Sequence, residues 1–152
     1  MKILILLTSL FALCACVGDS EVKESVKRAL NDPESARFTD LKPGKKQGDV
    51  CGFVNAKNRM GGYVGETPFV YIKTSGAVSM VSEVAQRDFR MLWSSIQAGN
   101  YSDDVDKLRN QCAAIDQWNA ACTTQITKYE MCSVFQGSGM ALYKELEAVF
   151  NR

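Results

Sequence analysis

The sequence predicts an α+β fold: an N-terminal helix, a three- to four-stranded antiparallel meander, and a helical C-terminal half made of a helix, a long helix and a terminal helix. Short apolar runs divided by turn residues between positions 50 and 81 are typical of strands. After position 82 the apolar residues recur at spacings of three and four, which is typical of helices. A glycine-rich connection between two of the apolar runs indicates a β-hairpin.

The first fifteen residues have the plan of an export signal. Lys2 precedes an apolar run from 3 to 13, and small residues follow it. The run is too short to span a bilayer, which needs about 20 apolar residues. Residues 13–16, Leu-Cys-Ala-Cys, resemble a bacterial lipobox, and this resemblance implies cleavage after Ala15 and a lipid on Cys16. Ordinary signal cleavage nearby is the alternative.

A lipid on Cys16 would make the membrane one partner of the mature chain. Val17, rather than an aspartate, follows that cysteine, and by resemblance to enteric lipoproteins this favours the outer membrane, facing the periplasm. Without residues 1–15 the chain holds 17 Lys and Arg against 17 Asp and Glu, because only Lys2 is lost from the 18 basic residues. This balance argues against nucleic acid as a partner.

A helix is expected from Glu21, with Val22 and Val26 on one face and acidic residues placed before basic ones. It ends at Pro33, because proline disfavours the helical conformation of the residue before it. We expect one further turn over 33–36, then an extended segment over 37–41. The polar segment 42–49, with three lysines, is expected to be a solvated loop.

The strands are expected at Val50–Ala56, Phe69–Ile72 and Ala77–Val81, with Arg37–Leu41 as a candidate fourth. The first of these has apolar residues on both faces, which predicts a central strand. Such a meander needs a helix to cover one face.

Ser82 and Ser102 are the predicted N-caps of the next two helices, and Gly99 ends the first of them. No glycine or proline interrupts 101–136, so a long helix packed antiparallel to a neighbour is expected there. Its apolar seam contains Val105, Leu108, Cys112, Ile115, Asn119, Cys122, Ile126 and Tyr129. A break at 137–139 precedes the terminal helix, 140–150. The chain thus divides into a signal peptide (1–15), a tether (16–20), a small α+β module (21–81) and a helical module packed on it (82–152).

The disulfide candidates are the four cysteines outside the signal and the lipobox: Cys51, Cys112, Cys122 and Cys132. An oxidising compartment permits two disulfides with three connectivities. Residues ten apart on a helix are about 15 Å apart, whereas a disulfide needs Cα atoms within about 7 Å. Two disulfides therefore require a bend, which we place near 119–124. A bond from Cys51 to the helical half is preferred, and its partner is left open.

The chain contains no histidine, which excludes Ser-His-Asp and Cys-His arrangements and His-based zinc sites. The cysteine spacings do not resemble zinc motifs. Asp103, Asp104 and Asp106 stand where acidic residues stabilise the start of a helix. We therefore predict no catalytic residues, no metal, no cofactor and no enzymatic activity.

The candidate binding residues lie in the connection 55–65: Asn55, Lys57, Asn58, Arg59 and Tyr63. The asparagines and Gly61-Gly62 tolerate positive φ, and the cations and the tyrosine would supply donors and a stacking surface. A carboxylate, a phosphate or a sugar would suit such a loop. The alternative is structural: the asparagines hydrogen-bond the loop backbone, and the glycines permit its path.

Residues 32–38, DPESARF, and the later pattern Cys51-Gly52, Val54-Asn55, Lys57-Asn58, Gly61-Gly62-Tyr63 and Gly65 resemble a family of small exported proteins from Gram-negative bacteria and their phages. The resemblance covers about 22–81 and implies no particular activity. The helical half lies outside it.

Three function hypotheses follow. The preferred one is a non-enzymatic, lipid-anchored envelope protein that binds an unknown protein or envelope ligand through residues 55–65. A phage-encoded superinfection-exclusion lipoprotein is the second, and a cell-envelope hydrolase is the third. The apolar seam of the long helix also suits oligomerisation, but an intramolecular helix pair would use the same face, so the oligomeric state is left open.

Overall fold

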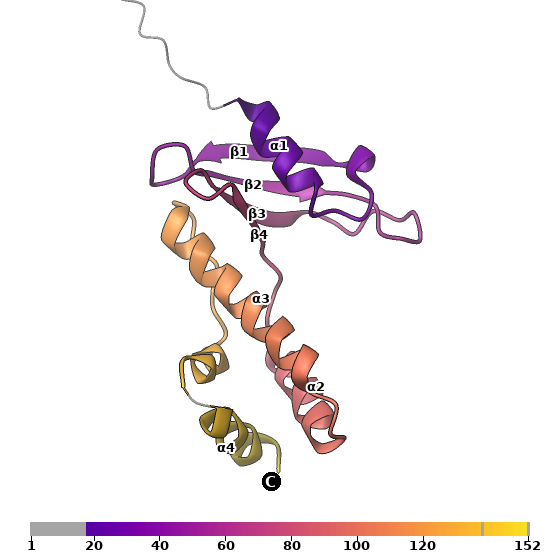
Figure 1. The fold of residues 1–152 in the computed structure, drawn as a ribbon, viewed down its shortest axis with the longest axis vertical. Coiled ribbons are helices and arrows are strands. Elements are labelled where there is room, and N and C mark those ends of the chain that lie inside the picture. The colour runs from indigo at the N-terminus through magenta and orange to yellow at the C-terminus, as the bar shows by residue number, and fades with distance from the viewer. Residues whose placement is uncertain (1–17, 138, 152) are drawn as a thin grey trace, which may run out of the picture.

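A computed structural model describes residues 18–137 and 139–151 of the chain; the predicted signal peptide and Cys16 lie outside this part. The chain forms a helix, a four-stranded antiparallel sheet and a helical half (Figure 1). The elements are α1 (Asp19–Lys27), η1 (Pro33–Ser35), β1 (Arg37–Pro43), β2 (Val50–Asn55), β3 (Thr67–Ile72), β4 (Ala77–Met80), α2 (Gln86–Gln97), α3 (Ser102–Ala121), η2 (Glu130–Gln136) and α4 (Gly139–Phe150). The predicted architecture is confirmed, the fourth strand included. None of the described helices is long and apolar enough to cross a membrane.

Helices cover both faces of the sheet, whereas the sequence predicted that a helix covers one face. Its strands follow the order β1-β2-β3-β4, so β2 is central, as expected. Because side chains alternate along a strand, Val54, Phe69 and Tyr71 share one core with α1. Cys51 and Val70 face the other way and share a core with the helical half. The sheet is therefore the middle layer between α1 and α3 (Figure 1).

A polar cluster fixes α1 on its face of the sheet. The Tyr71 hydroxyl donates to the Glu21 carboxylate at 2.7 Å, and the Lys73 ammonium donates to its two oxygens at 2.9 and 2.7 Å. The hydrogen bond from Lys73, followed by that from Tyr71, lowers the pKa of Glu21. The same carboxylate raises the pKa of Lys73 and that of Tyr71. The cluster favours the ionised glutamate and the protonated lysine and tyrosine.

One of the two edge strands of the sheet, β1, is irregular. Its pairing with β2 shifts register between Thr39 and Lys42, and Asp40 has a positive φ of 55°. Lys42 pairs with Asp40 at 2.8 Å, and Pro43 offers no N–H. A bulge, a lysine and a proline are features that keep an edge strand from pairing with another chain.

The predicted N-caps of α2 and α3 are wrong. α2 begins at Gln86, and the Asp88 carboxylate accepts a hydrogen bond from the Ala85 N–H at 2.8 Å in its first turn. Ser82 instead lies in an extended link that buries Val81 and Val84, and this burial outweighs capping at Ser82. Ser102 is already inside α3, and its hydroxyl donates to Asp103.

The unbroken helix expected over 101–136 is also wrong, because α3 ends at Ala121. A non-helical return segment, residues 122–129, leads back to η2. The bend lies where the cysteine spacing required one, within 119–124. Cys122 ends the helix because its sulfur is bonded to the sheet.

Two disulfides join the four predicted cysteines. Cys51 bonds Cys122 with Cα atoms 5.9 Å apart, and Cys112 bonds Cys132 with Cα atoms 5.7 Å apart. The first is the preferred link between the sheet and the helical half. By loop-closure entropy it contributes about 4 kcal/mol, and the second about 3 kcal/mol. The two bonds indicate an oxidising, extracytoplasmic location.

Candidate functional site

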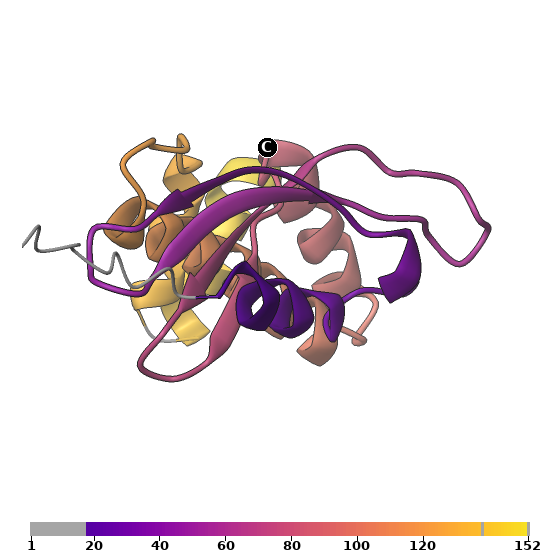
Figure 2. The ribbon, with the colours of Figure 1, turned by 90° about the horizontal axis from the view of Figure 1, so that it is seen from above.

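The segment 55–65 is a hairpin that extends past the end of the sheet between β2 and β3 (Figures 1 and 2). Its shape comes from two asparagines. The Asn58 side-chain oxygen accepts hydrogen bonds from the N–H groups of Met60 at 3.0 Å and Gly62 at 3.1 Å. The Asn55 side-chain oxygen accepts one from the Gly65 N–H at 3.2 Å. Both asparagines thus bind the loop backbone, as the structural alternative expected.

Glycine is required at two points of this hairpin. Gly61 has φ 80° and Gly65 has φ 95°, in a region that side-chain-bearing residues enter at a cost of about 1 kcal/mol. No atom outside the neighbouring residues lies within 4 Å of a Cβ built at either position. The backbone path alone selects glycine here.

The base of the hairpin is braced by η1. The Lys57 N–H donates to the Ser35 hydroxyl oxygen at 2.8 Å, and this hydroxyl donates to the Asp32 carbonyl at 2.9 Å. The Tyr63 hydroxyl donates to the Ser35 carbonyl at 3.4 Å. A β-bridge joins Lys57 to Tyr63. Residues 32–35, which contain η1 and its N-cap Asp32, therefore position the hairpin. They do not end α1, which already stops at Lys27, before the expected end at Pro33.

Tyr63 lies between two cations. The Arg37 guanidinium carbon is 4.4 Å from the ring centroid, and the Lys57 ammonium is 5.6 Å from it. Both distances are within the range of cation–π attraction. The Arg59 guanidinium donates to the Asn31 side-chain oxygen at 3.3 Å. Lys57 and Arg59 of the hairpin and Arg37 at the start of β1 thus form a cation cluster, which is held in place by the Tyr63 ring and the Asn31 amide.

Within the described residues, no carboxylate forms an ion pair with any member of the cation cluster. The hairpin itself contains no acidic residue. At its tip Met60 is 94% exposed, and Val64 is 62% exposed. Exposed apolar side chains beside cations without a carboxylate partner would complement a partner that offers anionic groups next to an apolar element.

The structure brings Lys57, Arg59 and Tyr63 onto one surface and assigns Asn55 and Asn58 to the scaffold. Sequence reasoning missed Arg37, Met60 and Val64. Arg37 pairs with Asn55 across β1 and β2, so a correct strand register would have placed it beside the loop. Met60 directly precedes Gly61-Gly62, a pair typical of a turn, and residues at a turn are usually exposed. This position was the sequence signal that could have identified Met60 as part of the surface.

A second concavity lies at the junction of the sheet and the helical half. It has a volume of about 260 Å³, and Phe53, Trp118 and Ile126 are among its lining residues. The charged residues at this hollow, Asp40 and Lys42, are paired with each other. The hollow therefore presents no unpaired charge, unlike the hairpin.

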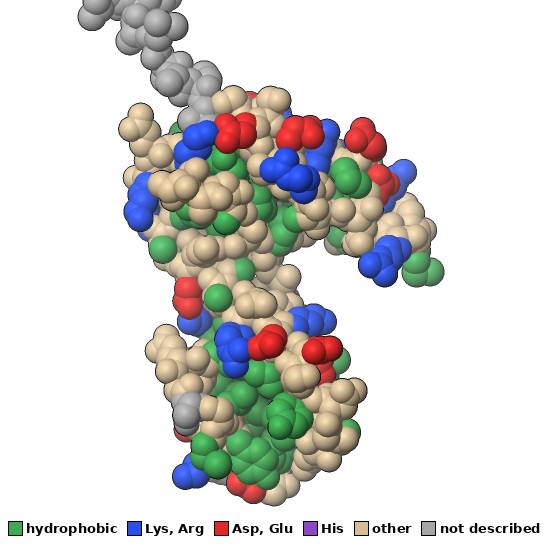
Figure 3. All heavy atoms as spheres, in the orientation of Figure 1, with side chains coloured by type: hydrophobic (Ala, Val, Ile, Leu, Met, Phe, Trp, Pro, Cys, Tyr) green, Lys and Arg blue, Asp and Glu red, His purple; other side chains and the backbone are tan. Residues whose placement is uncertain are grey.

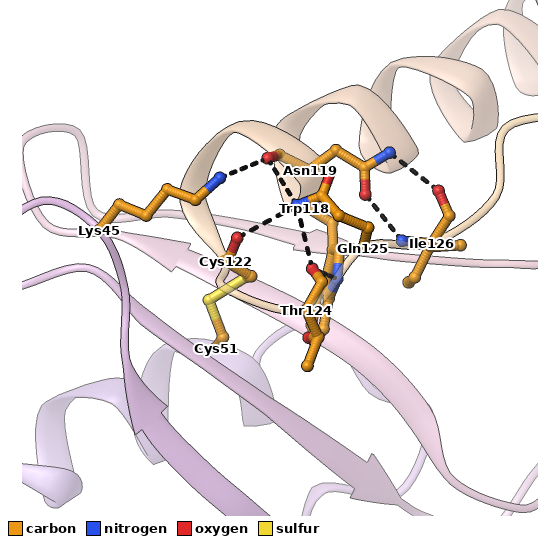
Figure 4. The surroundings of a disulfide bond; sticks show 8 residues. All are labelled: Lys45, Cys51, Trp118, Asn119, Cys122, Thr124, Gln125 and Ile126. Carbon is orange, nitrogen blue, oxygen red and sulfur yellow. Dashed lines mark hydrogen bonds between the residues drawn. A yellow bond between two sulfur atoms is a disulfide. The ribbon is translucent and has the colours of Figure 1, made fainter.

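The junction itself is fastened by the disulfide and by polar bonds to the end of α3 (Figure 4). Lys45 donates through its backbone N–H to the Ala121 carbonyl at 2.7 Å and through its ammonium to the Asn119 carbonyl at 2.8 Å. A cation at the carboxyl end of a helix is favourable. The solvated loop predicted over 42–49 is therefore wrong in part: Lys42 belongs to β1, and Lys45 caps a helix although it is exposed to solvent.

The aspartates at the start of α3 have separate partners. Asp103 accepts from Ser102, Asp104 accepts from Ser95, and Asp106 pairs with Arg109. Among the described residues no group of His, Cys, Asp and Glu could hold a metal ion. These contacts assign the three carboxylates to the helix and its neighbours.

Comparison of the chain with protein-family models, with curated proteins and with solved structures gave no match. The family resemblance of residues 22–81 stays a prediction.

Proposed function

We propose that this chain is a non-enzymatic, lipid-anchored binding protein of the cell envelope, held at the outer membrane through Cys16 and facing the periplasm. Its 55–65 hairpin binds a partner that offers anionic groups beside an apolar surface. One observation carries this proposal: the three cations of the cluster have no carboxylate partner in the described chain, and they stand on a shaped hairpin and the adjoining start of β1, with an exposed methionine at the hairpin tip.

The geometry of the sheet favours this role. The described chain begins at one end of the sheet, and the hairpin projects from the other end (Figures 1 and 2). An anchor on Cys16 would therefore leave the hairpin clear of the attachment point. The two disulfides agree with an exported chain.

Cross-linking of the full-length chain in cells tests the binding role. The double substitution Arg37→Ala and Arg59→Ala should remove the cross-linked species and leave the denaturation midpoint unchanged, because neither side chain is buried. Lys46→Ala is the matched control, since it removes an exposed cation from a different loop. Unchanged cross-linking in the double variant, or an equal loss in the control, would contradict the proposal.

Intact-mass measurement of the membrane fraction tests the anchor. Wild-type protein should carry the mass of an acylated cysteine and should gain the hydrogens of two disulfides on reduction. Cys16→Ser should abolish the acyl mass and release the chain from the membrane. A wild-type chain recovered with residues 1–15 still attached and no lipid would contradict the proposed anchorage.

A further inference from the structure

The helical half has a groove between η2 and α4 with a volume of about 490 Å³. Met131, Val134 and Val149 supply apolar lining, and Glu130 and Glu145 supply carboxylates. Both glutamates are exposed, and within the described residues neither side chain has a cation or hydrogen-bond partner. Figure 3 shows hydrophobic side chains gathered on the helical half. The groove thus combines an apolar surface with two unpaired acids.

The tip of the hairpin has the complementary features. Met60 is almost fully exposed, and methionine is an unbranched side chain that fits irregular apolar gaps. Arg59 directly precedes it, and Lys57 stands three residues before it at the base of the hairpin; neither cation has a carboxylate partner in the described chain. An apolar tip flanked by cations matches an apolar groove flanked by carboxylates.

The net charges of the sheet half and the helical half are also opposite in sign. Residues 18–81 hold ten Lys and Arg against eight Asp and Glu, a net charge of +2. Residues 82–152 hold seven Lys and Arg against nine Asp and Glu, a net charge of −2. The sheet half of one molecule is therefore attracted to the helical half of another, although the mature chain as a whole is neutral.

The hairpin and the groove cannot meet within one molecule. In Figures 1 and 2 the hairpin projects from the sheet on the side away from η2 and α4. A contact between them joins two different surfaces of two copies, which is a heterologous contact. Such contacts extend into chains or close into rings.

We propose that the partner of the hairpin is a second copy of this chain: Met60 enters the groove between η2 and α4, and Arg59 and Lys57 face Glu130 and Glu145. This inference rests on the proposed binding role of the hairpin. One hairpin tip buries less than the roughly 1,600 Å² of a standard interface, so the contact is weak in dilute solution. Anchorage of many copies on one membrane raises their effective concentration and favours the assembly.

Charge reversal tests the pairing in the purified full-length chain. Sedimentation equilibrium in density-matched detergent should show an average mass that rises with protein concentration and falls with added salt, because exposed charges are screened. Arg59→Glu and Glu145→Arg should each weaken association by about tenfold or more. Mixing these two variants, or combining both changes in one chain, should restore it, because the charges are again opposite.

The matched controls are Glu147→Arg, which reverses a charge on α4 outside the groove lining, and Lys46→Glu in the loop 42–49. Both should keep the wild-type mass. A chain that stays monomeric at every concentration, or association that the controls disrupt equally, overturns the inference. If in-cell cross-linking still depends on Arg37 and Arg59 while the chain is monomeric, the partner is another molecule and only this inference fails. If the chain is monomeric and in-cell cross-linking does not depend on Arg37 and Arg59 either, the proposed function fails too.

Discussion

Two irregular segments of this molecule are ordered in opposite ways. The hairpin 55–65 is shaped by the amide side chains of Asn55 and Asn58, and its tip is exposed. The return segment 122–129 begins at a buried disulfide, and the Trp118 indole N–H donates to the Thr124 carbonyl at 2.9 Å. The Asn119 side chain bonds both the N–H and the carbonyl of Ile126 at 2.8 Å.

The contrast shows that a segment can have a defined path without contributing to a core. The return segment is hydrogen-bonded to buried groups, so substitutions that remove these bonds should lower the free energy of unfolding. The hairpin is tied to itself and to η1, so its changes should alter local order and binding while the core persists. Substitutions in the two segments separate these behaviours, and a change at the polar cluster under α1 adds a third, smaller effect.

Removal of the junction disulfide should have the largest effect. The pair Cys51→Ala and Cys122→Ala should lower the free energy of unfolding by about 4 kcal/mol, because the bond closes a loop of 71 residues. The pair Cys112→Ala and Cys132→Ala should cost about 3 kcal/mol, because its loop spans 20 residues. Denaturant unfolding measures both. A larger loss from the second pair would contradict the loop-closure explanation.

Asn119→Ala should come next, with a loss of about 2 kcal/mol. It removes two hydrogen bonds to Ile126 and leaves partly buried backbone groups without partners. Gln125→Ala is the control in the same segment, because its amide makes only bonds of 3.2 to 3.4 Å. Equal losses in the two variants would show that Asn119 does not fasten the segment.

Asn58→Ala should lower the free energy of unfolding by about 1 kcal/mol at most. Its main effect should be faster hydrogen exchange at the N–H groups of Met60 and Gly62, which lose their acceptor. Asn58→Asp keeps an acceptor oxygen and should keep the exchange slow. Slow exchange in the alanine variant would mean that the hairpin is ordered by something else.

Glu21→Gln should have the smallest effect, visible as a change in pH dependence. The pKa of Glu21 is lowered in the fold, so its stabilisation is present above the ordinary glutamate pKa and is lost as pH falls through the folded value. The pKa values of Lys73 and Tyr71 are raised, so their stabilisation is lost as pH rises through the folded values.

Thermal melts across acidic and alkaline pH measure this effect. Glu21→Gln should flatten both arms of the profile, because the glutamine carries no charge for Lys73. Glu24→Gln, on the same helix but outside this cluster, is the control. If the melting temperature of Glu21→Gln depends on pH as that of the wild type does at both extremes, the cluster does not stabilise the packing of α1 on the sheet.

Three of the four strands could be predicted from the sequence because each carries its own apolar run, whereas Arg37–Leu41 was only a candidate fourth strand. Val50–Asn55 has apolar residues on both faces, and the turns around it contain glycine and proline. The ends of the helices could not be predicted, because they depend on groups that are distant in the sequence. α3 stops where Cys122 bonds Cys51 and where Lys45 caps the last carbonyls, and Lys45 is far away in the sequence.

Only part of the candidate site could be predicted from the sequence: Lys57, Arg59 and Tyr63 were identified, whereas Arg37, Met60 and Val64 were missed. The segment 55–65 contains an unusual mixture of asparagine, glycine and cations, which marked it. Arg37 joins it only through the register of β1 and β2. The groove between η2 and α4 forms where two separate segments meet, and η2 is itself held to α3 by the Cys112–Cys132 bond, so no local pattern could reveal it.

The two disulfides interleave along the chain, since Cys112 lies between the partners of the first bond. A polypeptide that emerges amino-terminus first exposes Cys51 and then Cys112, so oxidation in order of emergence would join those two thiols. The native connectivity therefore needs either oxidation delayed until Cys122 has appeared or thiol–disulfide exchange by an isomerase. Loss of the isomerase distinguishes the two routes: a mispaired form should accumulate if exchange is the route, and the native form should persist if oxidation is delayed.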